Sequence, residues 1–182
     1  MSIVQGLNFV DPKSVVDQLP IEMGNQVADF GCGSGYFSFE FARRVGMESG
    51  RVHALDVLPS ALDAVASRAK TMGLTNIVVK RVNLENEQGS GLAPLSMDWI
   101  VLKDVLLQNQ KKDVMLREVA RVLKPGGRAL IMEWSPDEVL VGPEKKLRVA
   151  PEELKKLIEV VELSVETELN VGGFHYGFVV KK

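Results

Sequence analysis

Three glycines at alternate positions follow a short apolar run that contains one acid, Asp29. The glycines are Gly31, Gly33 and Gly35, and the run Val27–Phe30 before them has the composition of a buried strand. Glycine suits a tight turn because it tolerates positive φ angles and lets a ligand approach the backbone closely. Apolar residues at helical spacing come next, and the free N–H groups of a helix N-terminus suit a carboxylate or a phosphate. The stretch therefore predicts a strand, a glycine turn and a helix that bind an anionic group.

The spacing of the glycines separates two classes of nucleotide ligand. The dinucleotide-binding pattern G-x-G-x-x-G places its third glycine where the helix packs on the strand. Counted from Gly31, that position is Tyr36, whereas the third glycine of this chain comes one residue earlier, at Gly35. Asp29 also comes two residues before the first glycine. The pattern D-x-G-x-G-x-G therefore argues against a nicotinamide dinucleotide.

A second acid follows the next apolar segment. Arg51–Asp56 has the composition of a short buried strand. Asp56 lies about 20 residues beyond the glycine turn, where a doubly wound fold places a carboxylate for ribose hydroxyls. Asp56 is therefore predicted to accept hydrogen bonds from a ribose.

The rest of the chain alternates between segments of strand length and segments with helical periodicity. Further strands are expected at Ile77–Val82, Met97–Leu102, Arg128–Trp134, Ser164–Leu169 and Phe174–Lys181. Helices are expected from Pro59 to Gly73, from about Lys111 to Lys124 and from Pro151 onward. Such alternation implies right-handed crossovers and a parallel sheet with helices on both faces, and the terminal hairpin adds an antiparallel strand at one edge. The sequence therefore predicts an α/β fold with a Rossmann-like, doubly wound, mostly parallel seven-stranded sheet and an antiparallel C-terminal strand.

The first 24 residues contain a short amphipathic piece. Asp11 is placed to cap it, Pro12 stands at its first helical position and Pro20 ends it. We expect residues 1–24 to form a lid over the site or a brace against the sheet. Because no repeat or linker composition divides the chain, its 182 residues are expected to form a single domain.

Composition bounds the classes of partner. No apolar run approaches the ~20 residues of a membrane span, and the N-terminus lacks the pattern of a signal peptide. The single cysteine excludes an intrachain disulfide, and a cytoplasmic location is expected. A formal net charge of −2 gives no global reason to expect nucleic acid, although a local basic patch and a homodimer both stay open. No cluster of Cys and His indicates a metal site.

Several stretches together resemble one enzyme family. Asp29–Gly35 is similar to the first motif of the class I S-adenosylmethionine (SAM)-dependent methyltransferases, and Asp56 stands where that family has its ribose acid. Leu116–Gly127 resembles the helix after the fourth strand in the family's broad small-molecule branch, and Phe174–Lys181 resembles its last antiparallel strand. The resemblance runs from about Asp11 to the C-terminus. It implies methyl transfer from SAM, with S-adenosyl-L-homocysteine as the product.

The resemblance also implies which residues bind SAM. Asp29 would face the methionyl amino group, and Asp56 would face two ribose hydroxyls. Val57 and Leu84 would enclose the adenine, with core packing as the alternative. Asn83 stands where the family commonly has Asp, and its side-chain oxygen can still accept from the adenine amino group or serve a turn. The full candidate set is Asp29, Gly31, Cys32, Gly33, Gly35, Tyr36, Asp56, Val57, Asn83, Leu84 and Lys103.

The residues that act on the methyl acceptor are unknown from the sequence. The family often has a His near Leu107, which is apolar here, and this argues against a histidine base at that position. Lys103 and Asp104 end one expected strand, where they would face the methyl group or form a surface ion pair. Glu133 and Trp134 end another and would line the acceptor pocket, with core packing as the alternative for Trp134.

Two further segments bear on the acceptor. His175 and Tyr176 are adjacent in an expected strand, so they point to opposite faces and one of them can reach the pocket, although an ordinary edge strand is the favoured reading. Residues 1–24, Glu85–Pro94 and Ser135–Val149 are expected to meet over the methyl group. The apolar residues expected near that rim are Leu7, Phe9, Leu106, Leu107 and Trp134. We therefore expect a partly apolar cavity for a small organic acceptor.

Three readings stay open at this point. The first is a methyltransferase that acts on a small molecule, and the second is the same chemistry on RNA or protein. The third is a SAM-binding module without catalysis. The near-neutral composition favours the first over the second.

Overall fold

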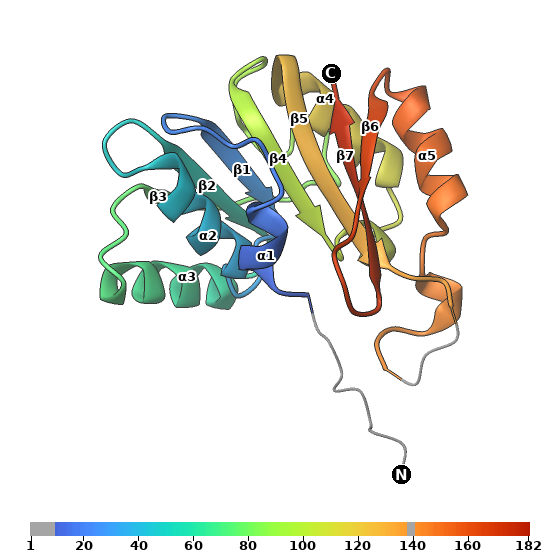
Figure 1. Cartoon of the computed structure of the whole chain (residues 1–182), viewed down its shortest axis with the longest axis horizontal. Coiled ribbons are helices and arrows are strands. Elements are labelled where there is room, and N and C mark those ends of the chain that lie inside the picture. Colours follow the sequence, from blue (N-terminus) through green and yellow to red (C-terminus); the bar gives the residue numbers. More distant parts are fainter. Residues whose placement is uncertain (1–9, 138–140) are drawn as a thin grey trace.

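The computed structural model describes residues 10–137 and 141–182, which form one sheet with helices on both faces (Figure 1). The sheet has seven strands in the order β3-β2-β1-β4-β5-β7-β6. The strands are β1 (Gln26–Phe30), β2 (Arg51–Asp56), β3 (Ile77–Arg81), β4 (Met97–Lys103), β5 (Leu123–Trp134), β6 (Ser164–Leu169) and β7 (His175–Lys181). The α-helices are α1 (Pro12–Val16), α2 (Tyr36–Val45), α3 (Pro59–Thr71), α4 (Lys112–Val122) and α5 (Pro151–Val160).

Strand direction confirms the predicted fold class. Neighbouring strands from β3 to β5 pair in parallel, whereas β7 pairs antiparallel with both β5 and β6. The terminal hairpin does stand at one edge of the sheet, but β6 is the outermost strand and the antiparallel β7 lies one position inside it. Since β7 starts beside the end of β5, the first residues of β7 reach the carboxyl edge of the parallel strands.

The helices cover the two faces of the sheet separately. Along β4, Trp99 and Val101 pack into the cluster of α1 and α2, whereas Ile100 and Leu102 pack into the cluster of α4 and α5. All four side chains are buried, as expected for a parallel sheet that is covered on both faces. Among the described residues, no helix combines the length and the apolar character that crossing a bilayer requires.

The end of α4 differs from the prediction. The helix stops at Val122 instead of near Lys124, and β5 begins at Leu123 instead of Arg128. Leu123 is fully buried and pairs with Met97 of β4, which draws it out of the helix and into the sheet. The register then shifts before Trp99 pairs with Arg128, so the Pro-Gly-Gly segment is accommodated as an irregularity within the strand.

The described part of the N-terminal segment packs against α2. The side chain of Asp11 accepts hydrogen bonds from the backbone N–H groups of Lys13 and Ser14, as predicted for the cap of a helix that starts at Pro12. Val15 and Val16 are buried in the cluster that also contains residues of α2. Residues 1–9, which include two of the apolar residues expected at the acceptor rim (Leu7 and Phe9), lie outside the described part of the chain.

Candidate active site

Two adjoining cavities open at the carboxyl ends of the parallel strands. Their volumes are about 420 Å³ and about 360 Å³, and we refer to them as the first and the second cavity. Gly31, Gly33 and Lys103 line both, so the two cavities meet at the glycine turn and the end of β4. This is the edge at which open α/β sheets bind their ligands.

The glycine turn is fixed by hydrogen bonds to its neighbours. The N–H groups of Gly31 and Cys32 donate to the carbonyl oxygen of Leu55 at 2.8 and 2.9 Å, which ties the turn to β2. Gly31 has φ = +74°, and a Cβ there would lie 2.7 Å from Cγ2 of Val105. A residue with a side chain would therefore be strained in this backbone conformation, and its Cβ would not fit beside Val105. The helix α2 starts directly after the turn, at Tyr36, as the sequence predicts.

Asp56 joins the glycine turn to the start of α3. Its Oδ2 accepts from the N–H of Gly33 at 2.9 Å, and its Oδ1 accepts from the N–H of Leu58 at 2.9 Å. The residue is only 8% exposed, yet it lines the second cavity. Because each carboxylate oxygen has two acceptor sites, both can still accept a hydroxyl from a ligand in that cavity.

The candidate adenine residues surround the second cavity. Val57 is half exposed, Leu84 is buried, and both line the cavity. Asn83 lines it too, and its Oδ1 accepts from the N–H of Glu85 at 3.0 Å. Asn83 therefore stabilises a turn, which is the alternative role expected for it. Its oxygen keeps a second acceptor site toward the cavity.

The first cavity begins at the buried acid of β1. Asp29 is 3% exposed, and its Oδ2 accepts from the hydroxyl of Ser38 at 2.6 Å. Burial raises the pKa of Asp29 to about 6, against the lowering effect of the Ser38 hydrogen bonds. Cys32 and Tyr36 line the same end of this cavity. Burial also raises the pKa of the Cys32 thiol, which keeps it protonated and unsuited to nucleophilic attack.

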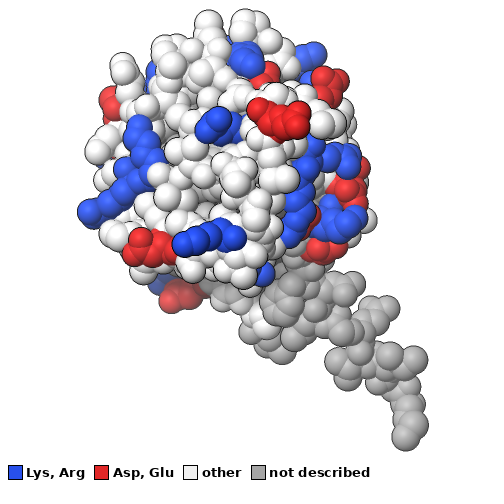
Figure 2. All heavy atoms as spheres, turned by 90° about the vertical axis from the view of Figure 1, so that its left-hand side faces the viewer, with Lys and Arg blue, Asp and Glu red and all other residues white. Residues whose placement is uncertain are grey.

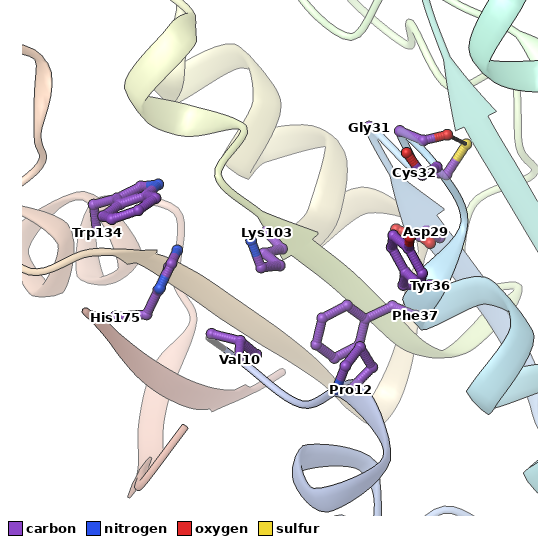
Figure 3. A pocket seen from close by; sticks show the side chains of 12 residues that line it. Val10, Pro12, Asp29, Gly31, Cys32, Tyr36, Phe37, Lys103, Trp134 and His175 are labelled. Atoms are coloured by element: carbon purple, nitrogen blue, oxygen red, sulfur yellow. Dashed lines mark hydrogen bonds between the residues drawn. The ribbon is translucent and has the colours of Figure 1, made fainter. Parts of the chain in front are cut away.

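The far end of the first cavity is formed by Trp134 and His175. These residues are directly paired at the ends of β5 and β7, and their ring centroids are 4.4 Å apart. Figure 3 shows them on one side of the cavity and Asp29, Cys32 and Tyr36 on the other, with Lys103 between the two groups. Val10 and Phe37 complete the wall with apolar surface.

An acidic residue connects Lys103 to this far end. Asp104 forms an ion pair with Lys103, and its Oδ2 and Oδ1 lie 3.3 and 3.0 Å from Nε2 of His175. Burial opposes ionisation of Asp104, but the hydrogen bond with His175 and the charge of Lys103 together lower its pKa below the ordinary value. The strand-end pair proposed from the sequence is therefore real, and the structure extends it to His175.

Three residues that were expected near the acceptor lie elsewhere. Within the described part of the chain, Glu133 and Leu106 are fully buried, Leu107 is nearly so, and none of them lines either cavity. Oε1 of Glu133 accepts from the N–H of Leu106 at 2.8 Å beneath the site, and both leucines belong to the core under α4. The expectation that Glu133 lines the acceptor pocket was wrong, because its side chain points into the core. The two leucines lie beneath the expected rim, because the chain after β4 turns inward to cover the sheet. Trp134 does line the pocket.

His175 is the site residue that sequence reasoning left undecided. As predicted, His175 and Tyr176 point to opposite faces, since the Tyr176 hydroxyl donates to the carbonyl of Val149 at 2.8 Å while His175 lines the first cavity. The alternation indicated that one of them could reach the pocket, and an ordinary edge strand was the favoured alternative. Which one it would be depends on the register of β7 against β5, and no local signal reports that register.

Known proteins match this chain over most of its length. A family model described as a methyltransferase domain matches residues 21–171. The ubiquinone/menaquinone biosynthesis C-methyltransferase UbiE of Haemophilus ducreyi is 32% identical over 131 residues, which are 71% of this chain and 49% of that protein. The arsenite methyltransferase of Aquipseudomonas alcaligenes is 37% identical over 134 residues, which are 65% of this chain and 38% of that protein. The chain thus spans about half the length of the first relative and less of the second.

Solved structures match the fold. A SAM-dependent methyltransferase from Aquifex aeolicus superposes with a TM-score of 0.85 at 24% identity, and the match covers 94% of this chain and 89% of that one. At this identity, the likeness shows the fold and leaves the chemistry to the site.

Proposed function

The chain belongs to the family of methyltransferase domains, and we propose that it transfers a methyl group from SAM to a small-molecule acceptor. The observation that carries the proposal is the meeting of the two cavities at Gly31, Gly33 and Lys103. The second cavity suits a nucleoside, and the near end of the first suits the methionyl part. The sulfonium group, which joins the nucleoside and methionyl parts of SAM, would then lie beside Lys103 and face the far end of the first cavity.

The residues around the cavities fit SAM chemically. Asp56 offers carboxylate oxygens to two hydroxyls, and Val57 and Leu84 offer apolar surface to a base. Gly33 leaves open space for a ligand against the backbone, because a Cβ there would meet no protein atom within 4 Å. Asp29 provides a carboxylate for an ammonium group at the near end of the first cavity.

The chain's own contribution is to align the acceptor and to exclude water. SAM supplies a methyl group that its sulfonium already activates. The apolar walls formed by Val10, Phe37 and Trp134 would keep water away from the reacting groups. Holding two reactants in line removes a large part of the entropic barrier, so positioning alone contributes much of the rate.

Three observations favour a small acceptor. The far end of the first cavity is part of a space of about 420 Å³ in all, which suits a small organic molecule. Figure 2 shows the side of the molecule that carries β3 and α3, where Lys and Arg are separated by uncharged atoms and by Asp and Glu. This side therefore lacks the continuous basic surface that RNA binding calls for. The names of the two curated relatives, which refer to quinone biosynthesis and to arsenite, point to small molecules as well.

Ligand binding tests the proposal directly. Isothermal titration calorimetry is expected to show binding of SAM and of S-adenosylhomocysteine, and NADH is expected not to compete with either. Tight binding of NADH without binding of SAM would overturn the proposed function.

Replacing Asp56 by alanine is expected to weaken SAM binding by an order of magnitude or more. A charged acceptor for hydroxyls contributes about 1.5–3 kcal/mol, which corresponds to roughly 10- to 150-fold in the dissociation constant. The matched control is Asp63→Ala, which removes the same charge from an exposed position on α3. Thermal unfolding should be recorded for both, because Asp56 also holds Gly33 and Leu58. An unchanged dissociation constant in a folded Asp56→Ala variant would remove Asp56 from the site.

A further inference from the structure

We propose that His175, oriented by Asp104, takes the proton from a hydroxyl group of the methyl acceptor, so that the acceptor is a small, flat hydroxyl compound of the phenol or enol class. This inference rests on the methyl transfer proposed above. It adds the acceptor group and the residue that activates it.

The first observation is that His175 is held by Asp104. Asp104 follows β4 and His175 opens β7, so the two residues come together across the end of β5 from positions 71 residues apart. The side chains are 4% exposed for His175 and 19% exposed for Asp104. A carboxylate beside Nε2 favours the tautomer that carries its hydrogen there. The lone pair is then on Nδ1.

The second observation is that Nδ1 has no partner. Among the described residues, Nδ1 of His175 is buried and accepts no hydrogen bond. Leaving a buried polar atom unsatisfied is unfavourable, and such atoms in native proteins call for an explanation. The imidazole lines the far end of the first cavity (Figure 3), and we assign to Nδ1 a donor group of a molecule bound there.

The surroundings of the imidazole define the shape of that molecule. Trp134 packs against the ring of His175 at a centroid distance of 4.4 Å, and Val10 and Phe37 add apolar surface to the same cavity. A flat apolar body fits such walls, with one polar group toward Nδ1. Lys103 places a cation between this end and the glycine turn, where it favours the negative charge that develops on the acceptor oxygen.

The acceptor oxygen forms a bond to the methyl carbon while the bond between that carbon and sulfur breaks, and the electron pair of the broken bond stays on sulfur in S-adenosylhomocysteine. The hydroxyl proton moves to Nδ1 of His175, and the carboxylate of Asp104 stabilises the resulting imidazolium. Solvent takes the proton after the products leave, which restores the neutral ring.

The tautomer can be measured without any ligand. The chain has two histidines, so the ring nitrogens of ¹⁵N-labelled protein give few signals, and the variant His53→Gln assigns them. At a pH where the rings are neutral, His175 is expected to carry its hydrogen on Nε2. A hydrogen on Nδ1 in the neutral ring would overturn the proposal, whatever the protein does with SAM.

The acceptor class can be tested with 4-nitrophenol, because its ionised form is visible by absorption spectroscopy. Added to the complex with S-adenosylhomocysteine, it is expected to bind the unmodified protein and the His53→Gln control as the phenolate. At a pH below the pKa of free 4-nitrophenol, His175→Gln should stay folded and keep its affinity for S-adenosylhomocysteine, but lose about tenfold in affinity for the phenol and leave it neutral. Absence of phenol binding, or equal ionisation in the His175→Gln variant, would overturn the inference. Failure of S-adenosylhomocysteine itself to bind would count against the proposed function instead.

Discussion

Replacing Gly33 by alanine is expected to weaken SAM binding strongly while the chain stays folded. Gly33 lines both cavities, and a Cβ there would meet no protein atom within 4 Å. The added methyl group would therefore occupy space that we assign to the cofactor. An extra carbon in a filled contact costs about 1–3 kcal/mol, which corresponds to roughly 5- to 150-fold in the dissociation constant. Calorimetry with SAM measures the effect.

The matched control for this variant is Gly126→Ala. Gly126 also has a left-handed backbone, with φ = +76° against +49° for Gly33, and open space at its Cβ position. It lies near the start of β5, at the opposite end of that strand from Trp134. Both variants should lose about 1–2 kcal/mol of stability from backbone strain, but only Gly33→Ala should lose affinity. If both variants bind SAM as tightly as the unmodified chain, the glycine turn does not hold the cofactor.

Local sequence patterns were sufficient to predict the fold. The alternation of strand segments with helical periodicity identified every strand. The five inner strands bury a run of apolar side chains, whereas the edge strands β3 and β6 have only half-buried ones. The start of β5 was the main error. The sequence Leu-Lys-Pro-Gly-Gly is compatible with a helix that ends at Lys124 and with one that ends at Val122. The pairing of Leu123 with Met97, which decides between them, depends on contacts between distant segments.

The two ends of the site differ in how well they could be predicted. The glycine turn and Asp56 could be proposed from the sequence because each has a local pattern, a glycine motif for one and a strand-end acid for the other. The structure brings them together through the hydrogen bond from the N–H of Gly33 to Asp56. The far end is assembled from the ends of different strands, so its residues have no shared sequence signal. Glu133 and Trp134 illustrate this. They are neighbours in β5, yet Glu133 is buried in the core and Trp134 lines the first cavity, so an error of one residue in register exchanges their roles.

Replacing Glu133 by glutamine is expected to remove a large part of the pH dependence of stability. Glu133 is fully buried, and Oε1 accepts one hydrogen bond from Leu106. Burial, with the nearby charge of Asp104 as a smaller contribution, raises the pKa of Glu133 from 4.5 to about 7, against the hydrogen bond from Leu106. Glutamine keeps an acceptor for that N–H and resembles the neutral acid in shape and charge.

The direction of the effect follows from proton binding. Between the two pKa values the folded state holds a proton on Glu133 that the unfolded state has released, so the free energy of unfolding falls as pH rises toward 7. The shift corresponds to about 3 kcal/mol lost by the time Glu133 is ionised in the folded state. Asp29, whose pKa burial raises to about 6, adds a loss of the same sign in both proteins. The difference between the variant and the unmodified chain isolates the contribution of Glu133.

Urea unfolding at several values between about pH 5 and pH 8 measures this difference. The variant Glu133→Gln should gain stability relative to the unmodified chain as pH rises, and most of the gain should appear below about pH 7. Glu118→Gln provides a control of opposite sign. Burial opposes ionisation of Glu118, but Arg121 and Ser90 outweigh it and lower its pKa. Its charged form therefore stabilises the fold above its ordinary pKa, and glutamine should destabilise the protein near neutral pH. A difference for Glu133→Gln that stays constant with pH would show that Glu133 binds its proton no more tightly in the folded protein than in the unfolded one.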